Sequence, residues 1–296
     1  MSIWALFLLI LVLVPLLYLY AVLPSLRFKK RALMPSGLYA HRGLYDNIGG
    51  VPENSMAAFR AAAEQGYRIE LDVQRTLDGK VIVFHDRSTG RMCGEDLTVC
   101  DHTWEELSHL QLIHTEEHIP LLADVLREID VPLLIDIKNP TTKKSSKSQT
   151  AKVARCVRRL ISGKEQSVLI QSADPRVLFW FRLHEPSFLR GQVRPDKFAV
   201  RDTHCAHDVR HRFRLRKPRI GARFQSFALR HSLLNFLSRP DFITMDFHQE
   251  EDLALLLSDR VLRTPMAACC VKNQDQLNYC RDTLYNIQIF DSFLAE

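Results

Sequence analysis

The sequence lacks any cysteine pattern typical of a structural zinc site or a redox motif. Its seven cysteines are scattered singly except for Cys269-Cys270, and no two of them are spaced as CxxC. Zinc ligands normally recur at such short spacings. An odd number of isolated cysteines also does not suit a disulfide framework, so we expect reduced thiols, which are typical of a globular part in the cytosol.

A glycine-rich phosphate loop is also absent. The first apolar run of the globular part ends at His41-Arg42-Gly43, which fits neither GxGxxG nor GxxxxGK[ST]. This counts against a doubly wound open sheet. The chain has no internal repeat and no low-complexity tract, and its 296 residues are 46% hydrophobic and 25% charged. Such a composition can form the core of one large domain.

Charge is missing from residues 3–23, which are almost entirely apolar. At about 1.5 Å per residue this segment can cross a hydrocarbon core of about 30 Å. A cleaved signal peptide has a positive start and a small-residue cleavage site, whereas the start MSIWALF is uncharged. We therefore expect residues 1–26 to be a single-pass transmembrane anchor.

Residues 27–36 form a basic juxtamembrane linker with Arg27, Lys29, Lys30 and Arg31. Positive flanks of a transmembrane helix stay on the cytoplasmic side and attract anionic headgroups. We expect a protein of the cell membrane whose globular part faces the cytoplasm. The formal net charge of +6 fits anionic lipid, an anionic substrate or nucleic acid, so charge alone does not choose among them.

Apolar runs alternate with segments of helical periodicity over residues 37–296, which is the pattern of repeated βα units. The expected strands are 38–41, 68–73, 81–85, 132–138, 167–172, 188–193, 242–246, 265–271 and 286–290. The expected helices are 55–65, 104–110, 121–129, 148–162, 174–183, 223–238, 249–257 and 274–283. With one hairpin across Leu77-Asp78-Gly79, about eight βα repeats remain, which predicts a TIM (β/α)8 barrel with an insertion around 87–120.

Acidic side chains end two of these apolar runs. Glu70 and Asp72 in RIELDV are separated by one residue, so a strand projects both to the same side. Two such carboxylates repel unless a cation bridges them, which favours a hard divalent ion. The alternative is a pair of solvent-facing acids on an edge strand. In LLIDIKN, Asp136 could supply a third oxygen ligand, and Lys138 could hold phosphate or pair with the acids.

Histidines end two further runs, His41 followed by Arg42 and His85 followed by Asp86. Such a pair can provide an acid and a base near neutral pH, although a histidine at a strand end is often only a structural hydrogen bonder. PENS at 52–55 precedes a predicted helix. Helix capping accounts for its Asn and Ser but not for Glu53, which could orient a histidine or the metal.

Seven short motifs occur in an order that resembles the signature of the glycerophosphodiester phosphodiesterase family. They are HRG at 41–43, PENS at 52–55, ELDV at 70–73, HD at 85–86, IP-L at 119–121, IDIK at 135–138 and QS at 171–172. Their joint order is specific, and the motifs extend from residue 41 to residue 172. The resemblance implies a TIM barrel that hydrolyses a phosphodiester with a bound divalent metal ion, Ca or Mg.

The resemblance also gives eight residues a role. It implies metal ligands at Glu70, Asp72 and Asp136, an acid and a base at His41 and His85, phosphate contacts from Arg42 and Lys138, and a supporting role for Glu53. The chain departs from the family pattern at Asp136, where Glu is usual. It also departs at ACCVKN, residues 268–273, where the family usually has an aromatic residue.

We therefore expect metal-dependent hydrolysis of glycerophosphodiesters, or of lysophospholipid headgroups, to a glycerol phosphate-type monoester and an alcohol. The alternative is a membrane-anchored, catalytically weak protein that binds glycerol phosphate or anionic lipid. Basic residues are dense over 190–230, either as a solvated surface or as a second membrane contact. They lack interleaved stacking aromatics, so we expect no nucleic acid partner. His204, His207 and His211 are too irregularly spaced for a metal site.

Overall fold

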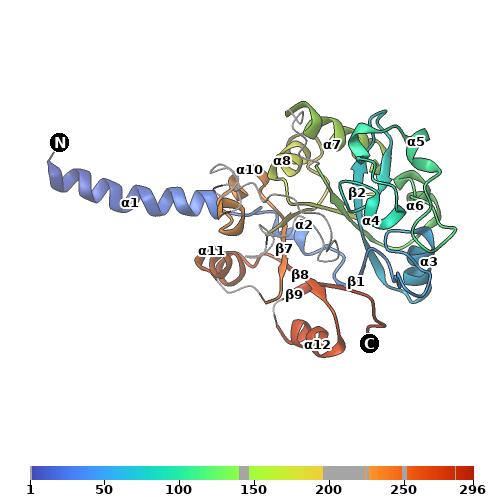
Figure 1. Cartoon of the computed structure of the whole chain (residues 1–296). Coiled ribbons are helices and arrows are strands. Elements are labelled where there is room, and N and C mark those ends of the chain that lie inside the picture. Colours follow the sequence, from blue (N-terminus) through green and yellow to red (C-terminus); the bar gives the residue numbers. More distant parts are fainter. Residues whose placement is uncertain (1, 140–146, 196–223, 225–226, 249–251, 284) are drawn as a thin grey trace, which may run out of the picture.

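The computed structural model describes residues 2–139, 147–195, 224, 227–248, 252–283 and 285–296. Nine strands lie in this part of the chain (Figure 1). They are β1 (Gly37–His41), β2 (Arg68–Arg75), β3 (Val81–Val83), β4 (Leu133–Ile137), β5 (Val168–Ser172), β6 (Arg190–Val193), β7 (Phe242–Asp246), β8 (Met266–Val271) and β9 (Tyr285–Phe290). Each of them coincides within a few residues with a strand predicted from the sequence.

The strands form one closed sheet. Their order is β1-β9-β8-β7-β6-β5-β4-β2-β3, and β1 also pairs with β2, which closes the ring. All pairings are parallel except that of β3 with β2. β3, the antiparallel member of the hairpin, therefore lies outside an eight-stranded parallel barrel, and the predicted TIM barrel is confirmed.

Helices surround the barrel on its outer side (Figure 1). Those near their predicted positions are α3 (Met56–Glu64), α5 (Trp104–Ser108), α6 (Leu122–Glu128), α7 (Lys147–Ile161), α8 (Pro175–His184) and α12 (Gln274–Asp282). The single helix expected at 223–238 is interrupted: residues 227–230 are helical, a turn with Ser232 at φ of 56° follows, and the short α10 (Asn235–Ser238) comes after it. The helix expected at 249–257 begins later, as α11 (Leu253–Leu256), and continues in a π-helical turn, η2 (Leu257–Val261).

Side chains alternate along the strands between two apolar layers. On β2, Ile69, Leu71 and Val73 are fully buried between the barrel and its helices. The interior layer includes Tyr39, Leu134, Leu169, Leu189, Phe242, Ala267, Ile287 and Ile289. The side chains on the opposite face of β2 therefore point into the barrel, where the polar residues of its upper layer gather.

The insertion predicted at 87–120 has a small core of its own. It contains α4 (Gly90–Cys93), the 3-10 turn η1 (Val99–Asp101) and α5. Met92, Val99 and Leu107 are buried there together with Ile82 of β3. Thr103 and Glu106 form a reciprocal capping box that begins α5. This packing fixes the position of α4 beside the carboxyl ends of the barrel strands.

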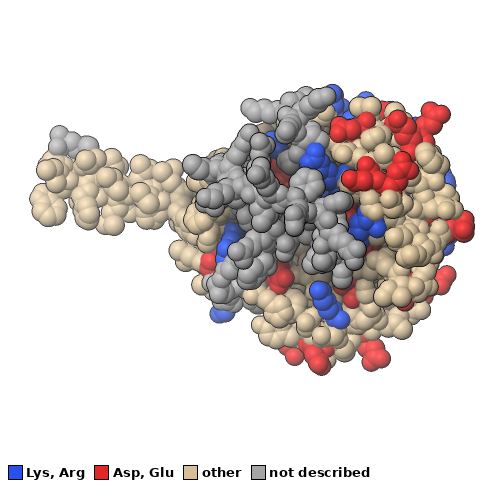
Figure 2. Space-filling model, in the orientation of Figure 1, with Lys and Arg blue, Asp and Glu red and all other residues tan. Residues whose placement is uncertain are grey.

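The N-terminal helix α1 (Ile3–Val22) projects away from the barrel (Figure 1). It is long and apolar enough to cross a membrane, and only 6% of its most apolar 18-residue window is buried. In the space-filling view the helix shows no charged side chain, whereas charged residues spread over the barrel (Figure 2). Length and composition alone do not separate a membrane span from a signal sequence.

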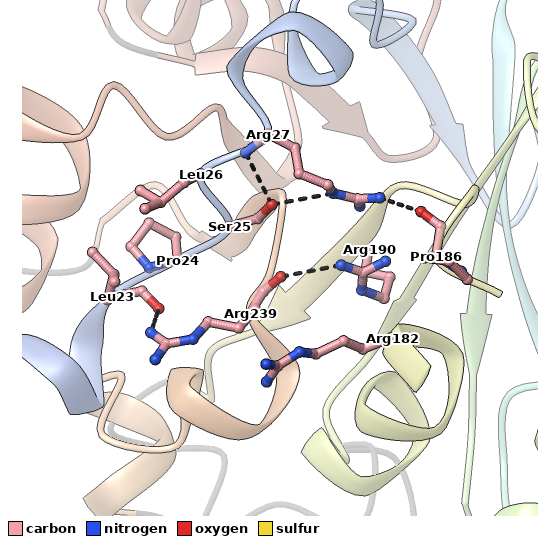
Figure 3. A pocket seen from close by; sticks show the side chains of 9 residues that line it. All are labelled: Leu23, Pro24, Ser25, Leu26, Arg27, Arg182, Pro186, Arg190 and Arg239. Atoms are coloured by element: carbon pink, nitrogen blue, oxygen red, sulfur yellow. Dashed lines mark hydrogen bonds between the residues drawn. The ribbon is translucent and has the colours of Figure 1, made fainter. Parts of the chain in front are cut away.

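The chain after α1 is tied to the start of the barrel strands (Figure 3). Arg27 pairs with the buried Asp241, and Arg239 Nη1 donates to the carbonyl of Leu23 at 2.6 Å. Arg31, in the short helix α2 (Phe28–Arg31), is only 5% exposed. Lys30 Nζ also donates to the carbonyl of Pro186 at 3.3 Å, so three of the four basic residues expected to face lipid contact the barrel.

Candidate active site

Three carboxylates meet inside the barrel at the carboxyl ends of β2 and β4. Asp72 and Asp136 are direct neighbours in the β2–β4 register, and Glu70 lies two residues earlier on β2. Ligand oxygens of all three lie within 4.8 Å of one another. Glu70, Asp72 and Asp136 are 3%, 1% and 6% exposed. The alternative of solvent-facing acids on an edge strand is therefore wrong, because β2 lies between β1 and β4 and its acids face inward.

Lys138 supplies the nearest positive charge to this group. Its Nζ lies 2.7 Å from Asp136 Oδ2 and 2.8 Å from Asp72 Oδ1. Asp72 also accepts a hydrogen bond from Asn54 Nδ2 at 3.0 Å, and Arg42 Nε lies 3.4 Å from it. Asp72 is thus the best compensated of the three carboxylates.

The pKa values of the three carboxyl groups are pushed apart. Burial, and then the charges of Asp72 and Asp136, raise the pKa of Glu70 well above its usual range. Burial also raises the pKa of Asp136, although Lys138 opposes that shift. For Asp72 burial acts in the same sense, but the charges of Lys138, His85 and Arg42 outweigh it and lower the pKa. Closely spaced carboxylates of this kind retain protons unless a cation compensates them.

Two oxygens of the group have no hydrogen-bond partner in the described part of the chain. They are Glu70 Oε2 and Asp136 Oδ1, and both are inaccessible to solvent. A buried carboxylate oxygen without a partner is costly. Oxygen ligands from carboxylates suit hard divalent cations such as Ca and Mg. The three side chains therefore fit a divalent metal ion, and the shorter Asp136 does not prevent the group from forming.

Arg42 and Glu53 form a second charged layer beside the carboxylates. Arg42 has φ of 58°, and its amide donates to the carbonyl of Glu70 at 2.9 Å. Its Nη1 donates to Glu53 Oε1 at 2.6 Å. Burial would raise the pKa of Glu53, but hydrogen bonds from Arg91, and the charge of Arg42, lower it to about 2. Glu53 is therefore a permanent anion that orients arginines.

Arg91 connects the insertion to the site. Its Nη2 donates to Glu53 Oε1 at 2.6 Å and its Nε donates to Asp86 Oδ2 at 2.5 Å. The other oxygen of Asp86 lies 2.7 Å from His85 Nδ1. Burial would raise the pKa of Asp86, yet the bonds from His85 and Arg91 hold it well below its usual range. The ring of His85 is thus oriented through a chain of ionic contacts that starts on α4.

His41 lies on the other side of the carboxylates, at the end of β1. Its Nε2 is 4.0 Å from Glu70 Oε2, and its Nδ1 is 3.7 Å from Asp291 Oδ1. Burial and the charge of Arg42 lower the pKa of His41, against the opposing contact with Asp291. The imidazole is therefore neutral near pH 7 and can accept a proton. All eight residues singled out in the sequence meet in one region.

Four further residues lie at the site although the sequence does not predict a role for them there. Asn54 was assigned to helix capping, but Ser55 caps α3 alone and Asn54 binds Asp72. Gln171 Nε2 donates to Glu70 Oε1 at 3.2 Å, and only its place in the QS motif pointed to it. Arg91 belongs to none of the motifs, and only its position in the insertion could have pointed to it. Asp291 directly follows the last strand and lies outside the seven motifs.

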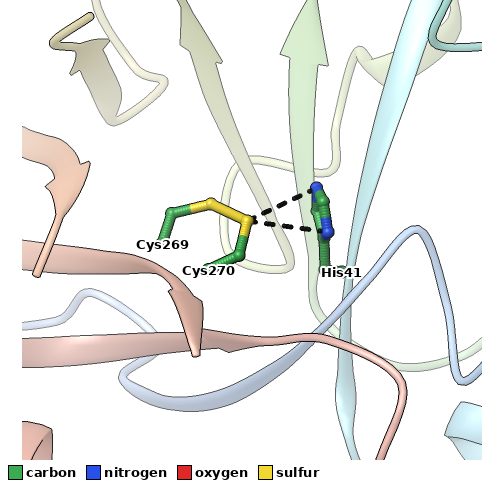
Figure 4. A group of neighbouring side chains, drawn as sticks. All are labelled: His41, Cys269 and Cys270. Carbon is green, nitrogen blue, oxygen red and sulfur yellow. Dashed lines mark hydrogen bonds between the residues drawn. A yellow bond between two sulfur atoms is a disulfide. The ribbon is translucent and has the colours of Figure 1, made fainter. Parts of the chain in front are cut away.

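Two cysteines also reach the site, where an aromatic residue was expected (Figure 4). Cys269 and Cys270 of β8 form a disulfide, so the prediction of reduced thiols is wrong for this pair. Four others are free thiols, Cys93, Cys100, Cys156 and Cys280. Cys205 lies outside the described residues, as do His204, His207, His211 and most of the basic segment.

The carboxyl ends of the strands in this TIM barrel carry carboxylates, histidines, an arginine and a lysine. Barrels with such a site form a class suited to metal-assisted chemistry on phosphate esters. The chain belongs to the glycerophosphoryl diester phosphodiesterase family, whose model matches residues 41–203, more than half of the sequence. The match begins at His41 and includes all eight residues predicted for the site.

Curated relatives match over part of their length. A glycerophosphodiester phosphodiesterase of Bacillus altitudinis is 36% identical over 110 residues, 37% of this chain and 41% of the relative. One of Caldanaerobacter subterraneus is 39% identical over 113 residues, 36% of this chain and 45% of the relative. The matched segment thus spans less than half the length of these relatives.

Solved structures match over most of the chain at low identity. A phosphodiesterase of Oleispira antarctica in complex with the product sn-glycerol-3-phosphate has a TM-score of 0.63 and 16% identity, over 89% of this chain and 95% of that one. A glycerophosphodiester phosphodiesterase of Thermotoga maritima has a TM-score of 0.60 and 21% identity, over 88% and 96% of the two chains. These likenesses establish the shared fold.

Proposed function

We propose that this protein hydrolyses glycerophosphodiesters to a glycerol phosphate-type monoester and an alcohol. The observation that carries the proposal is the convergence of three buried carboxylates, two histidines, an arginine and a lysine at one end of the barrel. Relatives named as glycerophosphodiester phosphodiesterases and the family match support it.

Glu70, Asp72 and Asp136 hold a divalent metal ion, Ca or Mg. When bound, such an ion neutralises phosphate charge and lowers the pKa of an attacking oxygen. The two unpartnered oxygens, Glu70 Oε2 and Asp136 Oδ1, support this role. Lys138 holds Asp72 and Asp136 in place and, being 29% exposed in its side chain, also presents charge to the phosphate. Arg42 adds a second phosphate contact from the end of β1.

His41 and His85 divide the proton transfers between them. His41 is neutral near pH 7, so it takes the proton from the attacking oxygen. His85 has its Nδ1 against the ionised Asp86, which leaves Nε2 as the atom that protonates the leaving alkoxide. Glu53 supports both the phosphate contact and the orientation of His85, because it binds Arg42 and Arg91.

A screen of diesters tests this proposal. Glycerophosphocholine, glycerophosphoglycerol and lysophospholipids are incubated with the full chain and Ca or Mg, and the released alcohol is measured. We expect turnover with at least one substrate, and a loss of at least a hundredfold in His41→Ala and His85→Ala. His109→Ala, on the exposed end of α5, is the matched control and should keep its activity. A folded protein that turns over none of these substrates would refute the proposal.

The protein acts at a membrane surface, with α1 as a single-pass anchor and the barrel on the cytoplasmic side. The apolar helix supports this, because it is long and apolar enough to cross a membrane. Lysophospholipids are therefore candidate substrates alongside soluble diesters.

Membrane anchoring is tested by fractionation of cells that express the full chain. The protein should stay in the membrane pellet after high-pH carbonate and should be released by detergent. Replacing Leu11 and Val12 together by Asp places two charges in mid-span and should release the protein, whereas the Ala replacements should not. Release of the wild type by carbonate alone would overturn the anchor.

A further inference from the structure

The cysteine pair on β8 and His41 on β1 form a second group of potential metal ligands (Figure 4). Cys270 Sγ lies 3.6 Å from His41 Nδ1 and 3.8 Å from Nε2. Ligand atoms of Cys269, Cys270 and His41 lie within 4.8 Å of one another. We propose that, once the disulfide is reduced, these three side chains bind a soft divalent ion, zinc above all.

The separation of the ligand atoms suits zinc. Zinc bonds of about 2.3 Å to sulfur and about 2.0 to 2.1 Å to nitrogen, at a tetrahedral angle, set sulfur and nitrogen about 3.5 Å apart. The 3.6 Å between Cys270 Sγ and His41 Nδ1 matches that edge. Three protein ligands leave a fourth position open, and Asp291 Oδ1, 3.7 Å from the same nitrogen, is placed beside it.

The strand geometry brings both sulfurs to the same place. In a regular strand, neighbouring side chains point to opposite faces. The pairing of β8 with β9 is irregular between Cys269 and Val271, so the alternation is interrupted where the pair occurs. Such irregularities near barrel rims redirect side chains. Both cysteines are partly exposed at the barrel mouth, where an ion can reach them.

This soft site and the carboxylate site select different ions. Thiolate and imidazole ligands favour zinc, whereas Glu70, Asp72 and Asp136 offer only oxygen, which favours Ca or Mg. His41 connects the two groups, since its Nε2 is 4.0 Å from Glu70. A zinc ion on His41 occupies the imidazole that accepts the proton in the proposed reaction. Zinc binding is therefore expected to inhibit turnover, and this consequence rests on the proposed function.

The disulfide controls access to the soft site, because its sulfurs carry no thiolate charge. A phosphine reductant opens it: the phosphine and one water give a phosphine oxide, and two electrons and two protons convert the disulfide to two thiols. Zinc binding then releases the thiol protons. The oxidised form keeps only one of the three ligands, His41.

Direct metal binding tests the proposal without reference to activity. The full chain in detergent is reduced with a phosphine, desalted without oxygen and titrated with zinc against a chelating dye, with saturating Ca present. Cobalt(II) is used in parallel, since thiolate ligation gives it an intense charge-transfer absorption. The reduced wild type should bind one zinc and show that absorption. Cys270→Ser, Cys269→Ser and the oxidised wild type should bind at least tenfold more weakly.

Cys100→Ser, on η1 in the insertion, is the matched control and should bind zinc as the wild type does. Thermal unfolding verifies that each variant is folded. Equal zinc affinity in Cys270→Ser and in the reduced wild type, or no thiolate absorption with cobalt, would overturn the proposal.

A second measurement compares turnover with and without zinc for each protein. The ratio should fall at least tenfold for the reduced wild type and change little for the oxidised protein. If no diester is a substrate, the titration still decides whether the soft site exists, so failure of the proposed function and failure of this inference are distinguishable.

Discussion

Gln171 Nε2 donates a hydrogen bond to Glu70 Oε1, so that one oxygen of the buried carboxylate is fixed while Oε2 stays without a partner. The amide of Gln171 is itself held, because Thr244 Oγ1 donates to its Oε1 at 2.7 Å. The two contacts span three strands and determine where the unpartnered oxygen points. Through these contacts Gln171, which is not itself a metal ligand, should affect the affinity of the site for metal.

Gln171→Ala should weaken metal binding without removing a ligand. Loss of such a supporting hydrogen bond typically costs about 10- to 100-fold in metal affinity. Calorimetry with Ca and Mg measures the affinity directly, and turnover at saturating metal should recover in large part. Gln65→Ala, on the exposed end of α3, is the control. An unchanged affinity in Gln171→Ala would show that Glu70 is positioned by other contacts.

Glu70→Gln should separate stability from function. The pKa of Glu70 is raised by burial and by its acidic neighbours, so ionisation of this carboxyl group destabilises the metal-free fold. The amide cannot ionise, and we expect a higher melting temperature in excess chelator. The stabilisation that Ca or Mg gives to the wild type should disappear, together with turnover. Glu64→Gln, exposed on α3, should change neither quantity.

Arg91→Ala should reduce both activity and stability. The substitution leaves Glu53 with Arg42 and Asn47 and leaves Asp86 with His85. Loss of one charged partner from a largely buried pair costs about 2 to 3 kcal/mol. Urea unfolding measures that loss, and turnover should fall about tenfold as His85 loses its orientation. Arg281→Ala, exposed on α12, is the matched control, and equal unfolding midpoints for the two variants would contradict the prediction.

Glu53 should make stability depend on acid pH. Its folded pKa of about 2 lies below the ordinary value of 4.5, so it stabilises the fold above pH 4.5 and loses that contribution as the pH falls toward 2. The full contribution is about 3 kcal/mol on this shift. The difference in unfolding free energy between wild type and Glu53→Gln should therefore shrink from pH 6 to pH 3. A difference that stays constant over this range would contradict the assignment.

Most strands of the barrel were predictable because they are buried and contain an apolar run, as in LLIDI of β4 and VLIQS of β5. Their ends carried the charged residues, so His41, Glu70, Asp72 and Asp136 were visible in the sequence. The helix predicted at 223–238 failed because the periodicity does not reveal the turn at Ser232.

The remaining site residues depend on contacts between distant segments. Arg91 reaches Glu53 only because the insertion has its own core, and no spacing in the sequence encodes that approach. Gln171 meets Glu70 because the β4–β5 register places it beside Asp136. The disulfide between Cys269 and Cys270 likewise depends on the irregular pairing of β8 with β9.

The pairing of β1 with both β2 and β9 has a consequence for how the protein is made. The three carboxylates lie on β2 and β4, which leave the ribosome early, whereas Asp291 directly follows β9 and contacts His41 across the seam of the ring. A nascent chain therefore contains both carboxylate-bearing strands before β9 has been made. Asp291 can contact His41 only once β9 has paired with β1 and closed the ring.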